Sequence, residues 1–235
     1  MLLEVKNIDV LYDDFQVIWD VSISVNKAEM VAILGPNGSG KSTILNTISN
    51  LVHHRNGSIH FADNLISEIP TYKRTELGIS HVLERRRVFP HLTVMQNLLL
   101  GAWHPKAKEQ LSNSLSKIYK IFPKLKVRSG QLARTMSGGE QQMLAIARGM
   151  MGLPKLLMVD EPFLGLSPMV VKDLIKIFKN IVSEGISILF VEQNVRLALS
   201  MADRGYVLES GRLVISGNSD DLIESDKVKK VFLGN

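Results

Sequence analysis

The sequence contains no cysteine among its 235 residues. A chain without thiols cannot form disulfides, use a cysteine nucleophile or hold a metal through thiolates. It also has no apolar run near the roughly 18 residues that a membrane-spanning helix needs, because the longest candidates, Met30–Leu34 and Met143–Ala147, are far shorter. The opening residues, Met1–Lys6, show no basic segment followed by an apolar one, so we expect no cleaved export signal and a location in the cytosol.

The composition is that of a globular protein, with 45% hydrophobic and 22% charged residues, which excludes disordered and collagen-like chains. At roughly 100 to 200 residues per domain, the length corresponds to one large domain or to a domain with an inserted lobe. The 28 lysines and arginines outnumber the 23 aspartates and glutamates, for a net charge of +5. This excess weakly favours anionic partners such as nucleotides, lipid head groups or nucleic acid.

Two kinds of apolar pattern predict two kinds of strand. Leu3–Val10 and Val17–Val25 alternate apolar and polar residues, as half-buried strands of an antiparallel sheet do. Met30–Leu34, Leu156–Val159 and Ile186–Val191 are largely apolar on both faces, which is typical of strands in a parallel sheet covered by helices. The sequence therefore predicts an α/β fold with a mostly parallel core sheet and an antiparallel part near the N-terminus.

A helical pattern separates the first of these buried strands from the second. Apolar residues recur there at helical spacing, namely Leu111, Leu115, Ile118, Tyr119 and Phe122. Further along, Tyr206–Leu208 and Leu213–Ile215 flank a turn and predict a hairpin. We predict one domain over the whole chain, in which 1–88 and 153–235 form the core with its antiparallel part and 89–152 form an inserted helical subdomain.

A glycine-rich segment follows the buried strand Met30–Leu34 and opens a helix with an apolar stripe. It fits the pattern G-x-x-x-x-G-K-S/T of phosphate-binding loops and, with the next threonine, consists of Gly35, Pro36, Asn37, Gly38, Ser39, Gly40, Lys41, Ser42 and Thr43. In such a loop, backbone N–H groups and the helix N-terminus surround phosphate oxygens, Lys41 places a cation on the β- and γ-phosphates, and Ser42 offers a hydroxyl to Mg²⁺. A strand-to-helix turn with a chance lysine is the alternative, and the buried strand before the loop and the apolar helix after it favour the phosphate-binding interpretation.

Two acidic residues, Asp160 and Glu161, come directly after the buried strand Leu156–Val159. Strand ends of an open α/β sheet gather around a ligand. There Asp160 would hold Mg²⁺ through water, and Glu161 would orient or deprotonate the attacking water. An acidic pair at a turn before Pro162 is the alternative, and the presence of the phosphate-binding loop favours the functional interpretation.

The segment Ser137-Gly138-Gly139-Glu140 precedes a further apolar helix. A capping box explains Ser137 and Glu140, whereas the two glycines would let the backbone approach a ligand at a positive helix end. Together with the phosphate-binding loop and the acidic strand end, the segment Met136–Gln142 resembles the signature of the nucleotide-binding cassettes of ABC ATPases. The resemblance covers nearly the whole chain and implies ATP and Mg²⁺ as cofactors.

The resemblance also implies a head-to-tail dimer in which two cassettes sandwich two ATP molecules. The signature of one cassette would then close on the γ-phosphate held by the other. Tyr12 lies where the family places the aromatic residue that stacks on adenine, and the loop Gly165–Ser167 matches the one that signals across the dimer. A tyrosine beside a strand is as often a core residue, so both interpretations of Tyr12 stay open.

Two positions depart from the usual ABC pattern. Glu84 stands after the strand Gly78–Leu83 where the family has a glutamine, and Gln193 stands after the third buried strand where it has a histidine. Gln193 can donate a hydrogen bond to the γ-phosphate but cannot carry a positive charge. Glu84 can accept from water or approach Mg²⁺, and beside a triphosphate it needs metal or arginine to screen its charge. The candidate catalytic residues are therefore Glu161, Glu84 and Gln193, and the candidate metal ligands are Ser42, Asp160 and Glu84.

These departures narrow the resemblance to the second ATPase subunit, of the LivF type, of branched-chain amino-acid importers. The similar segments are Glu84 with Arg86–Phe89, Glu161–Pro168, Val191–Asn194 and Phe232–Gly234. In such importers this subunit pairs with a related ATPase under two membrane permeases, which an external substrate-binding protein supplies. The resemblance implies a peripheral protein at the cytoplasmic face of the membrane, whose residues near Glu84 and after Phe89 receive cytoplasmic helices of the permeases.

Other functions remain as alternatives. Urea-type importers are the closest competitors among transporters, followed by lipopolysaccharide export, and Glu84 argues against the urea type. Non-transport ABC switches typically need two cassettes in one chain or a long coiled-coil insertion, and this length holds neither. A P-loop kinase would not explain the signature. The basic run Arg85–Arg87 is interpreted as a solvated loop facing the permeases, so no nucleic-acid partner is expected, and His53–His54 as surface rather than a metal site.

Overall fold

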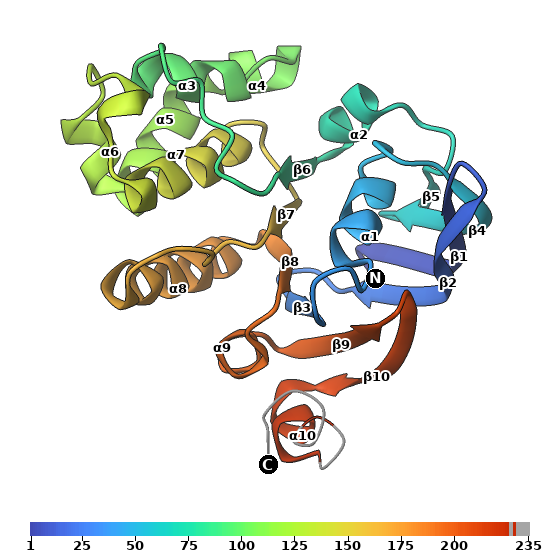
Figure 1. The fold of residues 1–235 in the computed structure, drawn as a ribbon. Coiled ribbons are helices and arrows are strands. Elements are labelled where there is room, and N and C mark those ends of the chain that lie inside the picture. Colours follow the sequence, from blue (N-terminus) through green and yellow to red (C-terminus); the bar gives the residue numbers. More distant parts are fainter. Residues whose placement is uncertain (226–227, 229–235) are drawn as a thin grey trace. The chain divides into compact units, whose positions relative to one another are not determined.

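The computed structural model describes residues 1–225 and 228, so the segment Phe232–Gly234 quoted above lies outside the described residues. Its contacts divide the chain into two compact units. The first contains Met1–Thr71 and Ser187–Asn235, and the second contains Tyr72–Ile186 (Figure 1). Strands and helices occur in both units.

The N-terminal part of the first unit is an antiparallel sheet with the strand order β2-β1-β4-β5 (Figure 1). The bounds are β1 Leu3–Tyr12, β2 Phe15–Val25, β4 His54–Phe61 and β5 Asn64–Leu65. Buried residues recur along β1 between more exposed ones, as its alternating sequence predicts. In the hairpin of β1 and β2, Leu3 pairs with Val25 and Tyr12 with Phe15, so the turn falls at 13–14.

The rest of the first unit is built around β3. The bounds are β3 Met30–Leu34, β8 Ser187–Glu192, β9 Arg204–Glu209 and β10 Arg212–Asn218, with helices α1 Lys41–Ile48, α9 Val195–Leu199 and α10 Ser219–Glu224. β3 lies between β8 and β9 and is parallel to both, and β10 pairs antiparallel with β9 as the predicted hairpin. All residues of β3 and β8 are buried, which confirms the prediction of strands covered on both faces.

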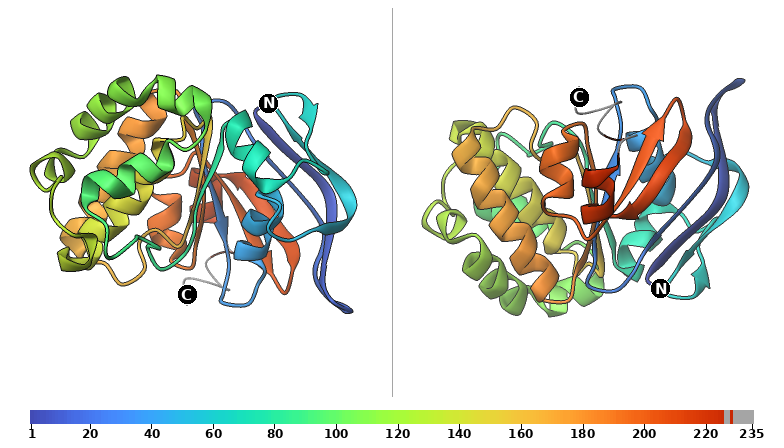
Figure 2. Two further views of the ribbon diagram at one scale, coloured as in Figure 1. Left: turned by 90° about the horizontal axis from the view of Figure 1, so that it is seen from above. Right: turned by 90° about the horizontal axis from the view of Figure 1, so that it is seen from below.

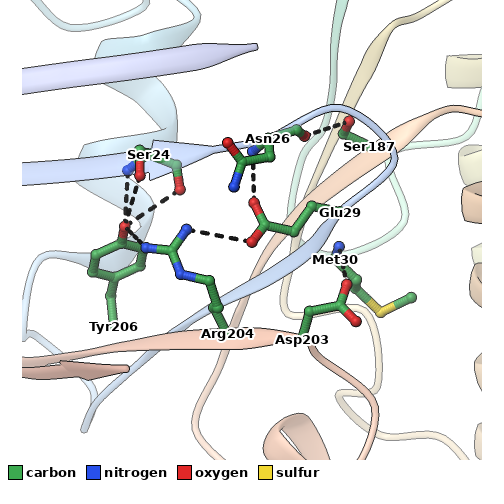
Figure 3. Close-up of polar contacts among 8 residues, drawn as sticks. All are labelled: Ser24, Asn26, Glu29, Met30, Ser187, Asp203, Arg204 and Tyr206. Atoms are coloured by element: carbon green, nitrogen blue, oxygen red, sulfur yellow. Dashed lines mark hydrogen bonds and ion pairs between the residues drawn. The ribbon is translucent and has the colours of Figure 1, made fainter. Parts of the chain in front are cut away.

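A polar cluster joins β2, β9 and the turn before β3 (Figure 3). The Arg204 guanidinium pairs with Glu29, at 3.3 Å between Nη1 and Oε1, and donates to the Tyr206 hydroxyl at 2.6 Å. That hydroxyl accepts from the Ser24 backbone N–H at 3.0 Å. Because Glu29 and Tyr206 are buried, each polar group needs a partner within the chain, and each has one. The cluster fixes the start of the strand that leads into the glycine-rich segment.

The second unit combines a pair of strands with a group of helices. Its strands are β6 Ile79–Val82 and β7 Leu156–Asp160, which pair in parallel. Its helices are α2 Thr71–Leu77, α3 Val94–Gly101, α4 Pro105–Glu109, α5 Leu111–Ile121, α6 Pro123–Val127, α7 Gly138–Met150 and α8 Pro168–Ser183, with a 3-10 turn at Ala133–Thr135. α3 and α5 pack on α7, and α5 also contacts α8 (Figure 2). Among the helices of the described residues, none is both long and apolar enough for a membrane span.

The local sequence accounts for where helices of this unit begin. α3 starts at a capping box, in which the Thr93 hydroxyl accepts from the Gln96 N–H at 3.1 Å and the Gln96 side chain accepts from the Thr93 N–H at 2.8 Å. α8 follows Ser167 and has Pro168 at its first position, where a missing N–H costs no helical hydrogen bond. α5 coincides with the periodic apolar residues that begin at Leu111.

The fold class predicted from the sequence, an α/β core with an antiparallel part and helices, is confirmed. Helices α3 to α7 all lie within 89–152, the interval that the sequence predicts as a helical subdomain. The compact unit that contains them, Tyr72–Ile186, is wider and includes β6, β7 and α8. The subdomain limits at 89 and 152 remain a prediction.

Candidate functional site

Lys41 places a buried cation where β3 leads into α1. The glycine-rich segment 35–40 connects these two elements, and Lys41 is the first residue of the helix. Its side chain is 4% exposed, and Nζ donates to the carbonyl oxygens of Gly35 and Pro36, at 3.0 Å each. The segment therefore curls around the ammonium group and holds a positive charge at a helix N-terminus, whose dipole has the same sign. That combination favours a multiply charged anion such as a phosphate.

Within the described chain, the N-terminus of α1 lacks the side-chain cap that many helices have. Among the described residues no side chain caps it, and the cap position is Gly40, with a φ of 99°. A side chain at Gly40 would be strained, and its Cβ would lie 2.4 Å from Ile18 Cδ1. The Ser39 hydroxyl oxygen is buried and has no hydrogen-bond partner within the part of the chain that the structure describes. A helix N-terminus without a side-chain cap and an unsatisfied buried hydroxyl fit the phosphates of a nucleotide, as the sequence predicts for 35–43.

Tyr12, the predicted adenine contact, is the last residue of β1. It pairs with Phe15 across the hairpin and is 45% exposed. This exposure excludes the alternative that Tyr12 is a core residue and leaves its ring accessible for stacking on a ligand. The identity of that ligand remains a prediction.

The structure brings Gln193 next to the phosphate-binding loop. In the parallel register of β3 and β8, Leu34 lies beside Glu192. The residues that come next, Gly35 and Gln193, therefore leave the same edge of the sheet, and Gln193 is exposed there. The sequence analysis assigns Glu192 no role of its own within the segment Val191–Asn194, yet Glu192 is 6% exposed and accepts from the Gln193 N–H at 3.1 Å. An acidic residue at the end of an apolar strand is the same signal that identified Asp160.

Three acidic residues follow the ends of β6 and β7 in the second unit. Val82 pairs with Val159 in the parallel register, so Glu84 and Glu161, each two residues further along, leave the same sheet edge. Asp160 ends β7 and is 5% exposed, whereas Glu161 is half-buried and has a φ of 44°. A left-handed backbone is uncommon for a non-glycine residue and recurs at functional sites. The predicted acids thus lie at one edge of the sheet, and their roles toward metal and water remain predictions.

Glu84 has an arginine neighbour that screens its charge. Arg85 Nε lies 3.4 Å from Glu84 Oε1, and the side chains of Arg85 and Glu84 are 81% and 38% exposed. An ion pair this exposed contributes little to stability. It does supply the screening that the sequence predicts a carboxylate would need beside a triphosphate.

The signature segment begins α7 with the predicted capping box. The Ser137 hydroxyl accepts from the Glu140 N–H at 3.4 Å, and the Glu140 carboxylate accepts from the Ser137 N–H at 2.9 Å. Arg128 pairs with the other carboxylate oxygen of Glu140 at 3.1 Å. Burial alone would raise the pKa of Glu140, but the hydrogen bonds from Ser137 and the charges of Arg128 and Lys124 hold that pKa below its usual value. Glu140 is therefore engaged within its own chain, and the exposed Ser137 is the signature side chain most open to a ligand.

Both signature glycines meet side chains of their own unit. A Cβ at Gly139 would lie 2.7 Å from Cγ1 of Val170 in α8, and a Cβ at Gly138 would lie 2.4 Å from Nη1 of Arg86. Close packing against the rigid Val170 side chain therefore requires glycine at 139, whereas at 138 the contact is with the movable end of the Arg86 side chain. The sequence suggests a different reason, the approach of a ligand to the backbone, and the contacts with Val170 and Arg86 could not be read from it.

A cavity of about 400 Å³ lies among helices and strands of the second unit. Its wall includes Phe89, Leu100 and Trp103, which are 48%, 45% and 42% exposed. It also includes Arg148, whose pKa is lowered by burial and which pairs with no carboxylate among the described residues. Exposed apolar side chains around a half-buried cation suit a protein segment that brings apolar and acidic residues.

Asn97 and Arg148 hold the loop on one side of this cavity. Asn97 is fully buried, and its side-chain amide bonds the Phe89 backbone, accepting from N–H at 2.9 Å and donating to the carbonyl at 3.0 Å. Arg148 donates to the Arg87 carbonyl at 2.7 Å and lies over the Phe89 ring at 5.1 Å. Neither residue belongs to a motif, and nothing in the sequence distinguishes either from the other polar residues of α3 and α7.

Comparison with known proteins points to one family. The family described as ABC transporter matches residues 18–164. The chain is 40% identical to the high-affinity branched-chain amino acid transport ATP-binding protein BraG of Pseudomonas aeruginosa, over 99% of this chain and 100% of the relative. It is 35% identical to the probable branched-chain amino acid transport ATP-binding protein LivF of Archaeoglobus fulgidus, over 99% of each chain.

A solved structure agrees with the sequence comparison. An ATP-binding cassette of an ABC transporter, crystallised in its ADP conformation, is similar with a TM-score of 0.88 and 28% identity. The match covers 100% of this chain and 99% of that chain. Sequence and fold similarity thus both extend over the whole length.

Proposed function

Because this chain belongs to the ABC transporter family and, as an ATP-binding cassette of that family, hydrolyses ATP to drive transport, we propose that it energises the import of branched-chain amino acids. The observation that supports this cargo most is the full-length similarity, at 40% identity, to a protein named for branched-chain amino acid transport. The open helix N-terminus, the buried lysine and the buried hydroxyl at 35–41 support the ATP-binding part of the proposal.

In this proposal the first unit binds the nucleotide. Lys41 neutralises the β- and γ-phosphates, and the N–H groups at the start of α1 bind their oxygens, with Ser42 and Thr43 completing the loop. Tyr12 stacks on the adenine. Gln193 donates a hydrogen bond to the γ-phosphate, which an amide can do without carrying charge.

The second unit supplies the acidic residues. Mg²⁺ bound with the nucleotide would neutralise charge on the phosphates. Asp160 is suited to hold this ion through water, and Glu84, screened by Arg85, is suited to contact its hydration shell. Glu161 orients or deprotonates the attacking water.

The proposed assembly contains a second, related ATPase and two membrane permeases. The two cassettes close head to tail, so that the signature residues Ser137 to Glu140 face ATP held by the other cassette. A cytoplasmic helix of a permease enters the cavity walled by Phe89, Leu100 and Trp103, whose exposed apolar side chains such a helix would cover. An external substrate-binding protein acts through the permeases, and this subunit lies at the cytoplasmic face of the membrane.

A pull-down from solubilised source membranes tests the proposal. The bait is tagged Glu161→Gln chain with ATP and Mg²⁺, and the control carries Lys41→Ala in addition, which removes the cation that holds the phosphates. We expect the bait to recover two dissimilar permeases and a second ATPase, and the control to recover less of the second ATPase. Turnover by the wild-type assembly should rise when a leucine-loaded binding protein is added.

Other outcomes of this experiment would redirect the proposal. Permeases of a urea-type or lipopolysaccharide-export system would change the cargo and leave the ATPase in place. Recovery of ribosomes, DNA or the bait alone would contradict the importer and favour a non-transport ATP switch.

A further inference from the structure

The side chain of Arg86 lies against the first glycine of the signature helix. A Cβ placed on Gly138 would lie 2.4 Å from Nη1, 2.7 Å from Cζ and 2.9 Å from Nη2 of Arg86, so the whole guanidinium group faces this backbone. A Cβ on Gly165 would lie 3.7 Å from Nη2. One side chain thus reaches both the signature and the loop that follows Glu161, and all of these residues belong to the second unit.

No described residue supplies a negative partner to this guanidinium. Within the residues that the structure describes, Arg86 makes no ion pair or side-chain hydrogen bond. The carboxylate on its own loop, Glu84, pairs with Arg85, and the carboxylate of the signature, Glu140, pairs with Arg128. Arg86 is half-buried, so water screens its charge only in part.

Two positive groups therefore lie side by side. α7 has 13 residues, and its N-terminus carries the positive end of the helix dipole. A guanidinium packed on that end repels it unless an anion binds both groups. The backbone that carries Arg86 is also unusual, because Arg85, Arg86 and Arg87 have φ values of 63°, 66° and 39°, in a region that L-residues rarely occupy in succession. The strained loop thus holds the Arg86 guanidinium at a position where no hydrogen bond or ion pair with the described residues stabilises it.

We propose that Arg86 is a further contact residue of the signature, donating to the terminal phosphate of ATP held by the facing cassette. The inference rests on the proposed function, which assigns the signature to the other cassette's nucleotide. A guanidinium offers two parallel N–H groups to phosphate oxygens, and it neutralises charge that Ser137 and backbone N–H groups can only solvate. Because the contact forms when two cassettes close, Arg86 acts on closure and turnover and leaves ATP binding by one subunit unchanged.

The test compares four variants of the full chain in the Glu161→Gln background, together with the cassette that co-purifies with it. Arg86→Ala removes the guanidinium, Arg86→Lys keeps its charge, and Ser137→Ala removes the neighbouring hydroxyl. Arg134→Ala is the matched control, because Arg134 is an exposed arginine of the same unit whose side chain makes no hydrogen bond or ion pair with the described residues. ATP-dependent closure is measured by analytical ultracentrifugation, and ATP affinity of the isolated subunit by titration.

Arg86→Ala should raise the ATP concentration needed for closure by about tenfold or more, the effect of losing a hydrogen bond to a charged group. Arg86→Lys should recover part of the loss, and Arg134→Ala should match the parent. ATP affinity of the isolated subunit and its thermal unfolding should be unchanged in Arg86→Ala. Equal losses in Arg86→Ala and Arg134→Ala, or a loss of ATP affinity in the isolated subunit, would overturn the inference.

Ser137→Ala separates this inference from the function on which it rests. If Ser137→Ala weakens closure while Arg86→Ala does not, Arg86 is no contact residue and the head-to-tail arrangement stands. If neither substitution weakens closure, the assignment of the signature to the facing nucleotide fails together with this inference.

Discussion

The N-termini of α1 and α7 carry the proposed chemistry in different ways. At α1 no described side chain caps the helix, Lys41 turns inward onto its own loop, and the Ser39 hydroxyl lacks a partner in the described chain. At α7 the side chains of Ser137 and Glu140 cap the helix reciprocally, and both following glycines are packed against side chains. A helix end without a cap offers its N–H groups to an anion, whereas at α7 the capping box occupies the N–H groups of Ser137 and Glu140. The difference supports the proposal that α1 binds the phosphates of the chain's own nucleotide and that α7 contacts a nucleotide held by another cassette.

The largest effect is expected at the open end. Lys41→Ala should lower the ATP affinity of the isolated chain by about a hundredfold or more, because each hydrogen bond to a charged group contributes about 1.5–3 kcal/mol. Titration with a fluorescent ATP analogue measures this affinity. Lys27→Ala removes the same charge from an exposed turn of the same unit and serves as the control. If Lys41→Ala and Lys27→Ala bound ATP with equal affinity, the N-terminus of α1 would not be the phosphate-binding site.

Glu161→Gln separates ATP hydrolysis from ATP binding, because it leaves the N-termini of α1 and α7 intact. If Glu161 positions or deprotonates water, replacing its carboxylate by the amide of glutamine should slow ATP turnover by about 10²- to 10⁴-fold. ATP should still bind, and closed cassette pairs should accumulate. Turnover is followed by phosphate release, and binding by titration. Weakened ATP binding instead would mean that Glu161 chiefly holds the metal ion.

Glycine substitutions distinguish packing from backbone strain at the two ends. Gly139→Ala should lower the free energy of unfolding by about 1–3 kcal/mol through overpacking against Val170, and adding Val170→Ala should restore most of it. At Gly40 an added Cβ would contact Ile18, and the φ of 99° strains any residue other than glycine. Ile18→Ala removes the contact but not the strain, so it should not restore the stability lost in Gly40→Ala. Urea unfolding of both double-mutant cycles gives the coupling energies. Similar rescue at both ends would show that packing alone requires glycine at both.

The smallest effect concerns the charge of the cap at α7. The pKa of Glu140 is lowered from 4.5 in the folded chain, so the carboxylate stabilises the fold above that value and its contribution is lost as pH falls through the lowered pKa. Glu140→Gln keeps the size of the side chain and removes its charge. The free energy of unfolding should differ from wild type by about 1 kcal/mol near neutral pH and converge with it in acid. A difference that does not change with pH would show that the charge is irrelevant to the cap.

The sequence predicts those parts of the site that depend on neighbouring residues. The strand before Gly35, the helix after Gly40 and the capping box of Ser137 and Glu140 are local features, and the structure contains all of them. The parallel strands could also be predicted, because burial on both faces leaves a continuous apolar run, as in Met30–Leu34.

The contacts between distant segments could not be predicted. Arg86 reaches Gly138 only because the loop after β6 takes a left-handed course, which nothing in an arginine-rich run indicates. Asn97 and Arg148 acquire their roles from backbone atoms of Phe89 and Arg87, and backbone contacts leave no pattern in side-chain chemistry. The sequence suggests that Gly139 lets a ligand approach the backbone, whereas in the fold this glycine packs against Val170.

In the proposed dimer, the N-terminus of α7 contacts a nucleotide held by another cassette. Vanadate, an analogue of the transferring phosphate, cleaves on irradiation the backbone that it touches, so the cut positions report contact. The decisive measurement uses tagged Lys41→Ala chain, which cannot hold its own phosphates, assembled with an intact cassette, ADP and vanadate, with fragments identified by mass spectrometry. We expect a cut in the tagged chain at 137–139 and none at 35–43. A cut at 35–43, or no cut at 137–139 while the intact cassette is cut at its own phosphate-binding loop, would contradict the proposed dimer.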